Sequence, residues 1–313
     1  MKTLIRLFAF GTALALPLAL SAKITRSVEK TFTVQPGGNL KALTEGGDIT
    51  VKTADANEIR VTAKEIINAS SEKEADELLE KLSLTFEQHG NDLTVESKYE
   101  KGISGFHFGN WPPVQVSLTV TVPKNFNLDL RTSGGDIAVV SLSGNVKAHT
   151  SGGELKFDRI EGEIDAGTSG GDIDLKEGTA RARLTTSGGN IVVDRAGGPT
   201  EVSTSGGDIT LNSVAELISA TTSGGNVKAN ITGPIKRDTV LSTSGGDVHV
   251  KVVKGTAFQL DASTSGGDVD AAGLTLTIDR GGVGKSRLVG AVNGGGSTLK
   301  LRSSGGDISV HAD

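Results

Sequence analysis

The chain of 313 residues contains no cysteine, one tryptophan and one tyrosine, and only 4% of its residues are aromatic. Without cysteine it can form no disulfide, so its stability has to come from packing and hydrogen bonding. Its five histidines are scattered without the spacing of metal ligands, which argues against a zinc site. Acidic and basic residues are interspersed, and the basic block that nucleic-acid binding requires is missing.

Long apolar runs are scarce as well, and the one present, residues 7–20, lies near the start of the chain. Lys2 and Arg6 precede it, and the small residues Ser21 and Ala22 follow it, which is the order of a secretory signal peptide. A glycine and a proline interrupt the run, and it is short for a membrane span. We therefore expect residues 1–22 to be a signal peptide and the rest to be exported, with no transmembrane segment.

Glycine, in contrast, is abundant, and much of it belongs to a repeated phrase, Ser-Gly-Gly-Asp or a close variant. Its serines recur at intervals of 18 residues, then 21, and finally 39: Ser133, Ser151, Ser169, Ser187, Ser205, Ser223, Ser244, Ser265 and Ser304. Self-similarity at a fixed spacing is typical of stacked-repeat proteins, in which each unit contacts only its neighbours.

One repeat, residues 169–186, shows how each unit folds. Its apolar residues form two alternating pairs, Ile173 with Leu175 and Ala182 with Leu184. A spacing of two residues is that of a β-strand with one buried face, and the pairs lie half a repeat apart. The pattern therefore predicts an all-β, single-stranded β-helix or β-solenoid with two short strands and two bends in each coil of about 18 residues.

The columns between these apolar positions are mixed and mostly polar, so we expect them to face water. The first column contains Ala138, Lys156, Asp174, Val192, Thr210 and Lys228, and the second contains Lys147, Asp165, Arg183, Glu201 and Ser219. Neither column carries aromatic residues, which the binding clefts of β-helical polysaccharide enzymes commonly use.

The glycine pair of each phrase is predicted to form the sharp bend, for two reasons. Glycine adopts left-handed backbone angles without steric cost, and its missing side chain lets coils stack closely. A threonine precedes each serine from Ser133 to Ser265, and by parity it points inward, where its hydroxyl can bond to the neighbouring coil. The predicted structural turns are Gly134, Gly135, Gly152, Gly153, Gly170, Gly171, Gly188, Gly189, Gly206, Gly207, Gly224 and Gly225.

An acidic column follows the glycines, and it admits two interpretations. Asp and Asn hydrogen-bond to the amides of nearby turns, so the column can cap the bends. Glycine-rich coils that carry aspartate can also bind calcium, although the usual spacing of such loops is missing here. We favour turn capping and keep calcium as the alternative, with Asp136, Asp172, Asp208, Asp247 and Asp268 as its candidate ligands.

The parts outside the regular repeats are expected to close the ends of the stack. Residues 23–128 form a β-rich capping region with one helix at about 71–82, in which Ser71 and Glu74 make a capping-box pair. Residues 129–313 form the solenoid. The close spacing of the last two glycine phrases, at 293–296 and 304–307, predicts a hairpin cap instead of a full coil.

An aromatic segment, residues 105–113, interrupts the capping region and holds the only tryptophan. It either packs on the cap or contacts a partner, and its candidate contact residues are Phe106, His107, Phe108 and Trp111.

Two motifs resemble those of enzymes, but one lacks the required structural context and the other departs from the required pattern. Residues 167–171 match the G-x-S-x-G pattern of hydrolases, yet they are one copy of the structural repeat and no helix follows them. Residues 281–286 resemble half of a phosphate-binding loop, but Asp279 stands where its first glycine is required. We therefore predict no catalytic residue, no metal site and no cofactor.

Taken together, these motifs resemble a widespread family of exported bacterial proteins of unknown function that are grouped with autotransporter-like adhesins. The resemblance depends on the early glycine phrase at 46–49, the strand at 120–123, the Thr-Ser-Gly-Gly-Asp/Asn-Ile repeats, and the closing segments at 294–301 and 304–308. It implies a right-handed β-solenoid in the periplasm, at the cell surface or outside a bacterium. It brings no catalytic residues with it, and fold alone does not fix function.

The function that we predict is a non-enzymatic binding or adhesion scaffold at the cell envelope, a monomer that binds a glycan, another envelope polymer or a surface protein. One alternative is a polysaccharide-active β-helix enzyme. Another is a purely structural envelope component.

Overall fold

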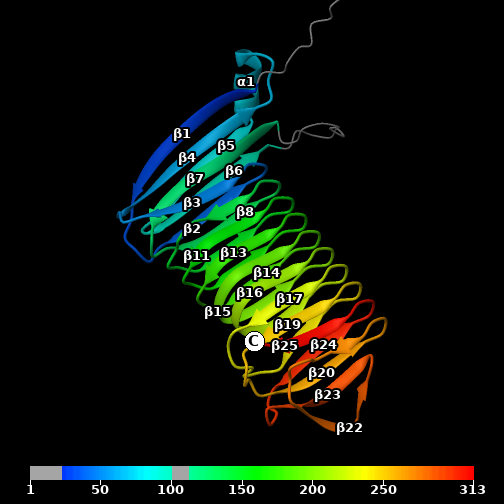
Figure 1. The fold of residues 1–313 in the computed structure, drawn as a ribbon. Coiled ribbons are helices and arrows are strands. Elements are labelled where there is room, and N and C mark those ends of the chain that lie inside the picture. The colour runs from blue at the N-terminus through cyan, green and yellow to red at the C-terminus, as the bar shows by residue number, and fades with distance from the viewer. Residues whose placement is uncertain (1–22, 101–112) are drawn as a thin grey trace, which may run out of the picture.

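The computed structural model describes residues 23–100 and 113–313, without the side chains of 279–283. These residues form a long rod of stacked coils with a single described helix near one end (Figure 1). The predicted all-β solenoid is therefore confirmed. The predicted signal peptide, 1–22, and the aromatic candidates Phe106, His107, Phe108 and Trp111 lie outside the described residues.

Each coil contributes one strand to each of two parallel sheets, which we call face A and face B. Along the rod, face A contains β6 (Asp92–Tyr99), β2 (Asn39–Thr44), β8 (Asn127–Thr132), β10 (Val146–His149), β12 (Ile164–Gly167), β14 (Ala182–Thr185), the second halves of β15 (Ile191–Ser203) and β16 (Ile209–Thr221), β18 (Thr239–Ser242), β24 (Thr298–Ser303) and β20 (Phe258–Thr264). Face B contains β7 (Val114–Pro123), β3 (Ile49–Ala54), β9 (Ile137–Val139), β11 (Leu155–Ile160), β13 (Ile173–Gly178), the first halves of β15 and β16, β17 (Val227–Ile231), β19 (Val248–Val252), β25 (Ile308–Ala312) and β21 (Val269–Asp270).

The core between the two faces follows the alternation seen in the sequence. Ile173, Leu175, Ala182 and Leu184 are each at most 1% exposed. Ile173 lies directly opposite Ile191 of the next coil, as successive units stacked in register require. The predicted inward columns are therefore the continuous apolar core of the rod.

The predicted threonine column is buried at the corner that joins face A to face B, and each hydroxyl links two coils. Thr186 donates from Oγ1 to the carbonyl oxygen of Gly171, one coil back, at 2.9 Å. The Oγ1 atom of Thr186 also accepts from the amide of Gly189, within its own turn, at 3.3 Å. Equivalent bonds recur along the stack at Thr132, Thr150, Thr168, Thr204, Thr222, Thr243 and Thr264.

The glycine pairs lie at the bends of this corner, but one of the two reasons given for them is wrong. Positive φ angles occur at glycines elsewhere in the described chain and not at the repeat glycines. What excludes side chains is close stacking: a Cβ on Gly171 would lie 2.1 Å from the carbonyl oxygen of Gly153. The first glycine of the pair is less confined, because a Cβ on Gly170 would meet its nearest atom, the carbonyl oxygen of Gly152, at 3.4 Å.

The order of coils at the C-terminal end departs from the order of the chain. Strands β24 and β25 do not form the predicted hairpin with each other. Instead, β24 pairs in parallel with β18 and β20, and β25 pairs in parallel with β19 and β21. The last coil in the sequence is thus a full coil inserted between two earlier ones. The hairpin that closes this end is β22 (Leu276–Gly284) with β23 (Arg287–Val292), and β23 runs antiparallel to β20.

The N-terminal end has a corresponding departure. The coil of β2 and β3 lies between the coil of β6 and β7 and the coil of β8 and β9. Beyond it, β4 (Glu58–Ile67) and β1 (Ile24–Thr33) extend face B with antiparallel strands, and β5 (Leu82–His89) extends face A. The region predicted as a cap therefore adds complete coils to the rod as well as closing it.

The predicted helix is α1 (Glu72–Leu79), shorter than expected because Leu82 already begins β5. Ser71 caps it by accepting the amide of Glu74 at 3.2 Å, while the Glu74 carboxylate accepts the amide of Ser70 at 2.7 Å. In residues 23–100 and 113–313, no helix is both long enough and apolar enough to cross a membrane.

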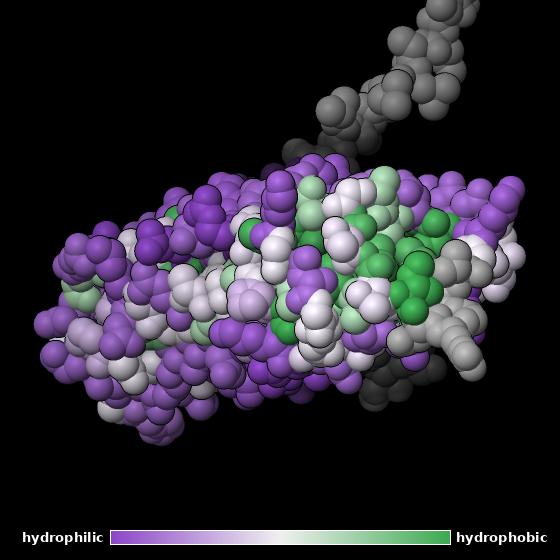
Figure 2. Space-filling model, turned by 60° about the horizontal axis from the view of Figure 1, so that its bottom comes forward, coloured by the Kyte–Doolittle hydropathy of each residue, from purple (hydrophilic) through white to green (hydrophobic). Residues whose placement is uncertain are grey.

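Most of the surface of the rod is polar. Figure 2 brings its C-terminal end forward and shows apolar side chains gathered on part of this view. At this end Ile278 of the closing hairpin is 47% exposed, and Leu274, Leu276 and Leu288 are only partly buried against the core.

Candidate functional site

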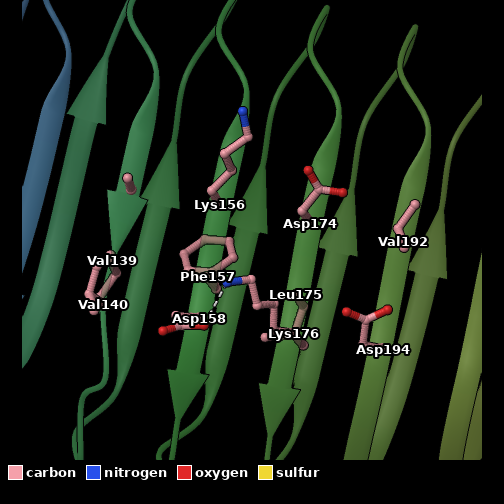
Figure 3. Close-up of a pocket in the computed structure, with 11 residues that line it drawn as sticks. Val139, Val140, Lys156, Phe157, Asp158, Asp174, Leu175, Lys176, Val192 and Asp194 are labelled. Carbon is pink, nitrogen blue, oxygen red and sulfur yellow. Dashed lines mark ion pairs between the residues drawn. The ribbon is translucent and has the colours of Figure 1, made fainter.

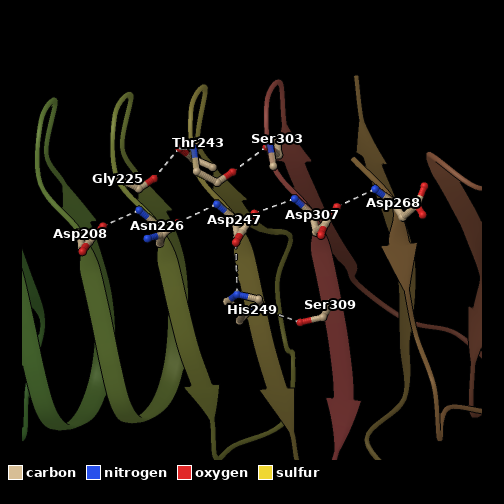
Figure 4. A network of polar contacts seen from close by, with 12 residues as sticks. Asp208, Gly225, Asn226, Thr243, Asp247, His249, Asp268, Ser303, Asp307 and Ser309 are labelled. Atoms are coloured by element: carbon tan, nitrogen blue, oxygen red, sulfur yellow. Dashed lines mark hydrogen bonds and ion pairs between the residues drawn. The ribbon is translucent and has the colours of Figure 1, made fainter. Parts of the chain in front are cut away.

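The acidic column, considered above as a possible calcium ladder, forms a chain of hydrogen bonds from coil to coil. The Oδ1 atom of Asp172 accepts the backbone amide of Asn190 at 2.6 Å, and Oδ1 of Asn190 accepts the amide of Asp208 at 2.8 Å. Figure 4 shows the same pattern continuing through Asp247 and Asp307 to Asp268. The side chains therefore satisfy amides at the bends, which is the turn-capping role.

Each coil contributes one side chain to this column. Among the residues with described positions, no group of three or more His, Asp or Glu side chains converges as a metal site would require. The calcium candidates Asp136, Asp172, Asp208, Asp247 and Asp268 thus share one edge of the rod, each beside the amide of its neighbour.

A shallow groove of about 370 Å³ lies on the outer side of face B, across β9, β11, β13 and β15 (Figure 3). We call it groove 1. It is lined by two outward rows, one side chain from each coil: Ala138, Lys156, Asp174 and Val192, and then Val140, Asp158, Lys176 and Asp194. Apolar side chains form its two ends, and charged side chains of both signs form its floor.

The two lysines of groove 1 form ion pairs, one between coils and one within a coil. Lys176 binds the Asp158 carboxylate at 3.0 Å. The ion pair and hydrogen bond with Glu154 raise the pKa of Lys156. Partial burial raises the pKa of Asp174, against the opposing effect of Lys156. The groove thus offers cations, carboxylates and short apolar surfaces within one extended strip.

A second groove of about 560 Å³, groove 2, lies on the same face nearer the C-terminal end. Its outward side chains are Asn212, Lys228, Asn230, His249, Lys251, Ser309 and His311, on β16, β17, β19 and β25. His249 Nδ1 lies 2.6 Å from the Ser309 hydroxyl, across the boundary with the inserted coil. Groove 2 therefore depends on that coil. Like groove 1 it carries two lysines, and asparagine and histidine side chains stand where groove 1 has carboxylates.

Face A is hollowed as well, but by smaller or more polar depressions. One of about 480 Å³ is lined by Asn39, Lys41, Asp92 and their neighbours. Another of about 360 Å³ is lined by Lys147, Glu163, Asp165, Arg181 and Arg183. Both faces therefore present polar groups beside hollows, and groove 1 on face B adds the apolar side chains of Val140 and Val192.

Sequence reasoning identified the first outward row of groove 1 but not the hollow itself. The row Ala138, Lys156, Asp174 and Val192 was predicted to face water, and it does so. What was missed is that small side chains at Ala138 and Val192 leave room beside the longer ones. The predicted partner-contact aromatics lie outside the described residues.

Comparison with solved structures gives several likenesses at low identity. A candidate adhesin from Parabacteroides distasonis is 12% identical, with 91% of this chain and 97% of that one covered at a TM-score of 0.49. A candidate lipid-binding protein from the same species is 16% identical, with 91% and 96% covered at 0.45. A candidate adhesin from Bacteroides fragilis is 14% identical, with 91% and 97% covered at 0.41.

No curated protein is significantly similar to the chain. The profile of the Toastrack DUF4097 family, in contrast, matches residues 39–311, which covers most of the sequence and nearly the whole stack of coils. The family resemblance inferred from the repeated glycine phrases is confirmed, and the chain belongs to the Toastrack DUF4097 family.

Proposed function

We propose that the protein is a non-enzymatic binding scaffold of the bacterial cell envelope, which holds an extended polymer along the outer side of face B. The observation that supports this most directly is the position of grooves 1 and 2 on one face, in register along the same rod. An extended ligand running along the rod can contact both. A compact substrate would need a single enclosed pocket instead.

The chemistry of the face favours a glycan or another polar envelope polymer as the partner. A sugar ring presents hydroxyls at its rim and apolar C–H groups on its faces. Groove 1 offers charged hydrogen-bonding groups on its floor and Val140 and Val192 at its ends. Such contacts are individually weak, so affinity would come from their repetition over several coils.

The test is binding of the purified protein to bacterial envelope fractions and isolated envelope glycans. We expect Lys156→Glu with Lys176→Glu to weaken binding severalfold, and Lys228→Glu with Lys251→Glu to do the same. All four changes together should abolish it. The matched control is Lys147→Glu with Arg183→Glu on face A, which should leave binding unchanged. Equal losses from the control and the test variants would contradict the use of face B.

A polysaccharide-active enzyme is the second candidate, and one observation favours it. Asp158, Asp174 and Asp194 line the same groove, and the raised pKa of Asp174 is a feature of general acids. An enzyme would produce new reducing ends from an envelope polysaccharide and would lose all activity in Asp174→Asn. A scaffold would produce none and would bind Asp174→Asn almost as well as the wild type.

A further inference from the structure

The inserted coil of β24 and β25, residues 298–312, makes the same contacts with its two neighbours as any coil of the stack. Leu299, Leu301, Ile308 and Val310 are completely buried in the core. The hydroxyl of Ser303 donates to the carbonyl oxygen of Gly246 at 2.8 Å on one side. On the other side, the hydroxyl of Thr264 donates to the carbonyl oxygen of Gly306 at 2.7 Å.

The ladder of turn amides also runs through this coil without a break. The Asp307 amide donates to Oδ1 of Asp247, and the Asp268 amide donates to Oδ1 of Asp307, each at 2.8 Å. Figure 4 shows the strand of Asp307 and Ser309 lying between the strands of Asp247 and Asp268. The gap between these two earlier coils is therefore a slot shaped for one further coil.

The two walls of the slot can also pair with each other. Both carry the repeat pattern, Thr243 with Asp247 on one wall and Thr264 with Asp268 on the other. Any two coils with this pattern can pair, because the threonine and aspartate side chains of one coil bond to backbone groups that every coil has. Nothing in these contacts requires the inserted coil to come from the same polypeptide.

The linker into the slot has the features of a hinge. Residues 293–297 join β23 to β24, and Asn293, Gly294, Gly295 and Gly296 all have positive φ angles. Few hydrogen bonds hold this segment, among them Asn293 Nδ2 to the carbonyl oxygen of Thr256 at 2.9 Å. This linker connects the coil to the preceding part of the chain, so a change of its backbone angles would carry residues 298–312 out of the slot.

A specific contact holds the coil in place. The Arg302 guanidinium donates to the Asp261 carboxylate at 2.5 Å and to the Asp261 carbonyl oxygen at 2.6 Å, across the wall formed by β20. Both side chains are largely shielded from solvent, which makes this pair stronger than the exposed pairs elsewhere on the rod.

From these contacts we propose that the slot between β18–β19 and β20–β21 is a coil-exchange site, which accepts residues 298–312 of a second copy of this chain. A reciprocal exchange joins two copies in a closed pair, and a one-way exchange leaves an open slot that can bind a third copy. The proposal does not depend on the polymer-binding function, because groove 1 lies apart from the slot. Groove 2 includes Ser309 and His311 of the inserted coil, and the coil of a second copy would supply the same two residues.

Cross-linking between two single-cysteine chains tests this directly, since the natural chain has no cysteine. Val240 and Lys300 are register partners on β18 and β24. Folded Val240→Cys and Lys300→Cys chains are mixed, incubated at high concentration and treated with a short bis-maleimide. A cross-link between different chains forms only when one chain donates its coil to the other, so we expect heterodimers whose yield rises with concentration.

Two controls make the outcome decisive. Lys147→Cys and Asp165→Cys chains carry register partners on coils that follow chain order, and they should give no such heterodimer. The Arg302→Gln change should speed exchange by about tenfold, the effect of losing roughly one charged hydrogen bond. Arg181→Gln, which breaks an exposed pair with Glu201, should not change the rate.

A heterodimer yield no higher than that of the control pair would overturn the proposal. So would failure of a single chain with both Val240→Cys and Lys300→Cys to cross-link internally at low concentration, since the coil would then not occupy the slot.

Discussion

At the scale of single residues, close approach between coils explains the second glycine of each repeat. A Cβ on Gly135 would lie 2.1 Å from the carbonyl oxygen of Gly47, whereas one on Gly134 would meet nothing within 4 Å. We therefore expect Gly135→Ala to lower the free energy of unfolding by on the order of 2–4 kcal/mol, because backbone has to move. Gly134→Ala should change it by less than about 0.5 kcal/mol. Chemical denaturation of both variants measures the difference, and equal stabilities would contradict this explanation.

A buried carboxyl gives a second prediction at the residue scale. Glu65 on β4 is only 7% exposed, and burial raises its pKa, while its register partner Arg26 lowers it. A raised pKa means that the folded state disfavours the charged carboxylate. The resulting loss of folding stability is complete at pH values above the raised pKa, and it is absent at pH values below the ordinary pKa of 4.5. Glu65→Gln should therefore raise the Tm at pH 7 and leave it unchanged near pH 4.

The matched control for this carboxyl is Glu29→Gln on the exposed side of β1, which should shift the Tm at neither pH. If Glu65→Gln lowers the Tm at pH 7, the carboxylate stabilises the cap and the assigned cost of burial is wrong.

At the scale of the coil, the threonine ladder is the contact that joins neighbouring turns. Thr186→Val keeps the shape but leaves the carbonyl oxygen of Gly171 without its hydroxyl donor, so we expect a loss of about 1–3 kcal/mol. Thr185→Val, one residue earlier on the exposed side of β14, should cost much less. Thermal and denaturant unfolding of the two variants compare them, and a larger loss at Thr185 would contradict the inward assignment.

The same scale shows what a sequence can predict about this fold. Alternation at Ile173 and Leu175, repeated every 18 residues, determines which side chains are buried, because a strand has only two sides. The backbone angles of the glycine corner could not be read in this way. Glycine permits both a left-handed turn and close stacking, and the sequence does not tell which of the two is used.

The order of the coils could not be predicted either, for a physical reason. The phrases that begin at Ser244, Ser265 and Ser304 carry equivalent ladder groups, so any of them can stack on any other. The closing hairpin of β22 and β23, the pair of Arg302 with Asp261 and the contact of His249 with Ser309 are among the features that distinguish the observed order. For the candidate site, the outward row was predictable, but the hollow depends on side-chain sizes across four coils.

At the scale of the whole molecule, the outward row of face B that begins at Lys156 keeps its register along the rod. Lys156 begins a row in which each residue is the register partner of the next one. The row ends at Asp270 on the last strand of face B, and between them lie Asp174, Val192, Thr210, Lys228, His249 and Ser309. With coils about 4.8 Å apart, Ser309 is about 29 Å from Lys156, and Asp270 is about 34 Å from it.

The most direct test of this architecture is the distance between spin labels placed in pairs on the cysteine-free chain. We predict that labels at Lys156 and Ser309 give a shorter peak distance than labels at Lys156 and Asp270, by about one coil spacing. Stacking in the order of the sequence would give the opposite ranking, with the label at Ser309 the farther of the two. That result would contradict the inserted coil and the slot that surrounds it.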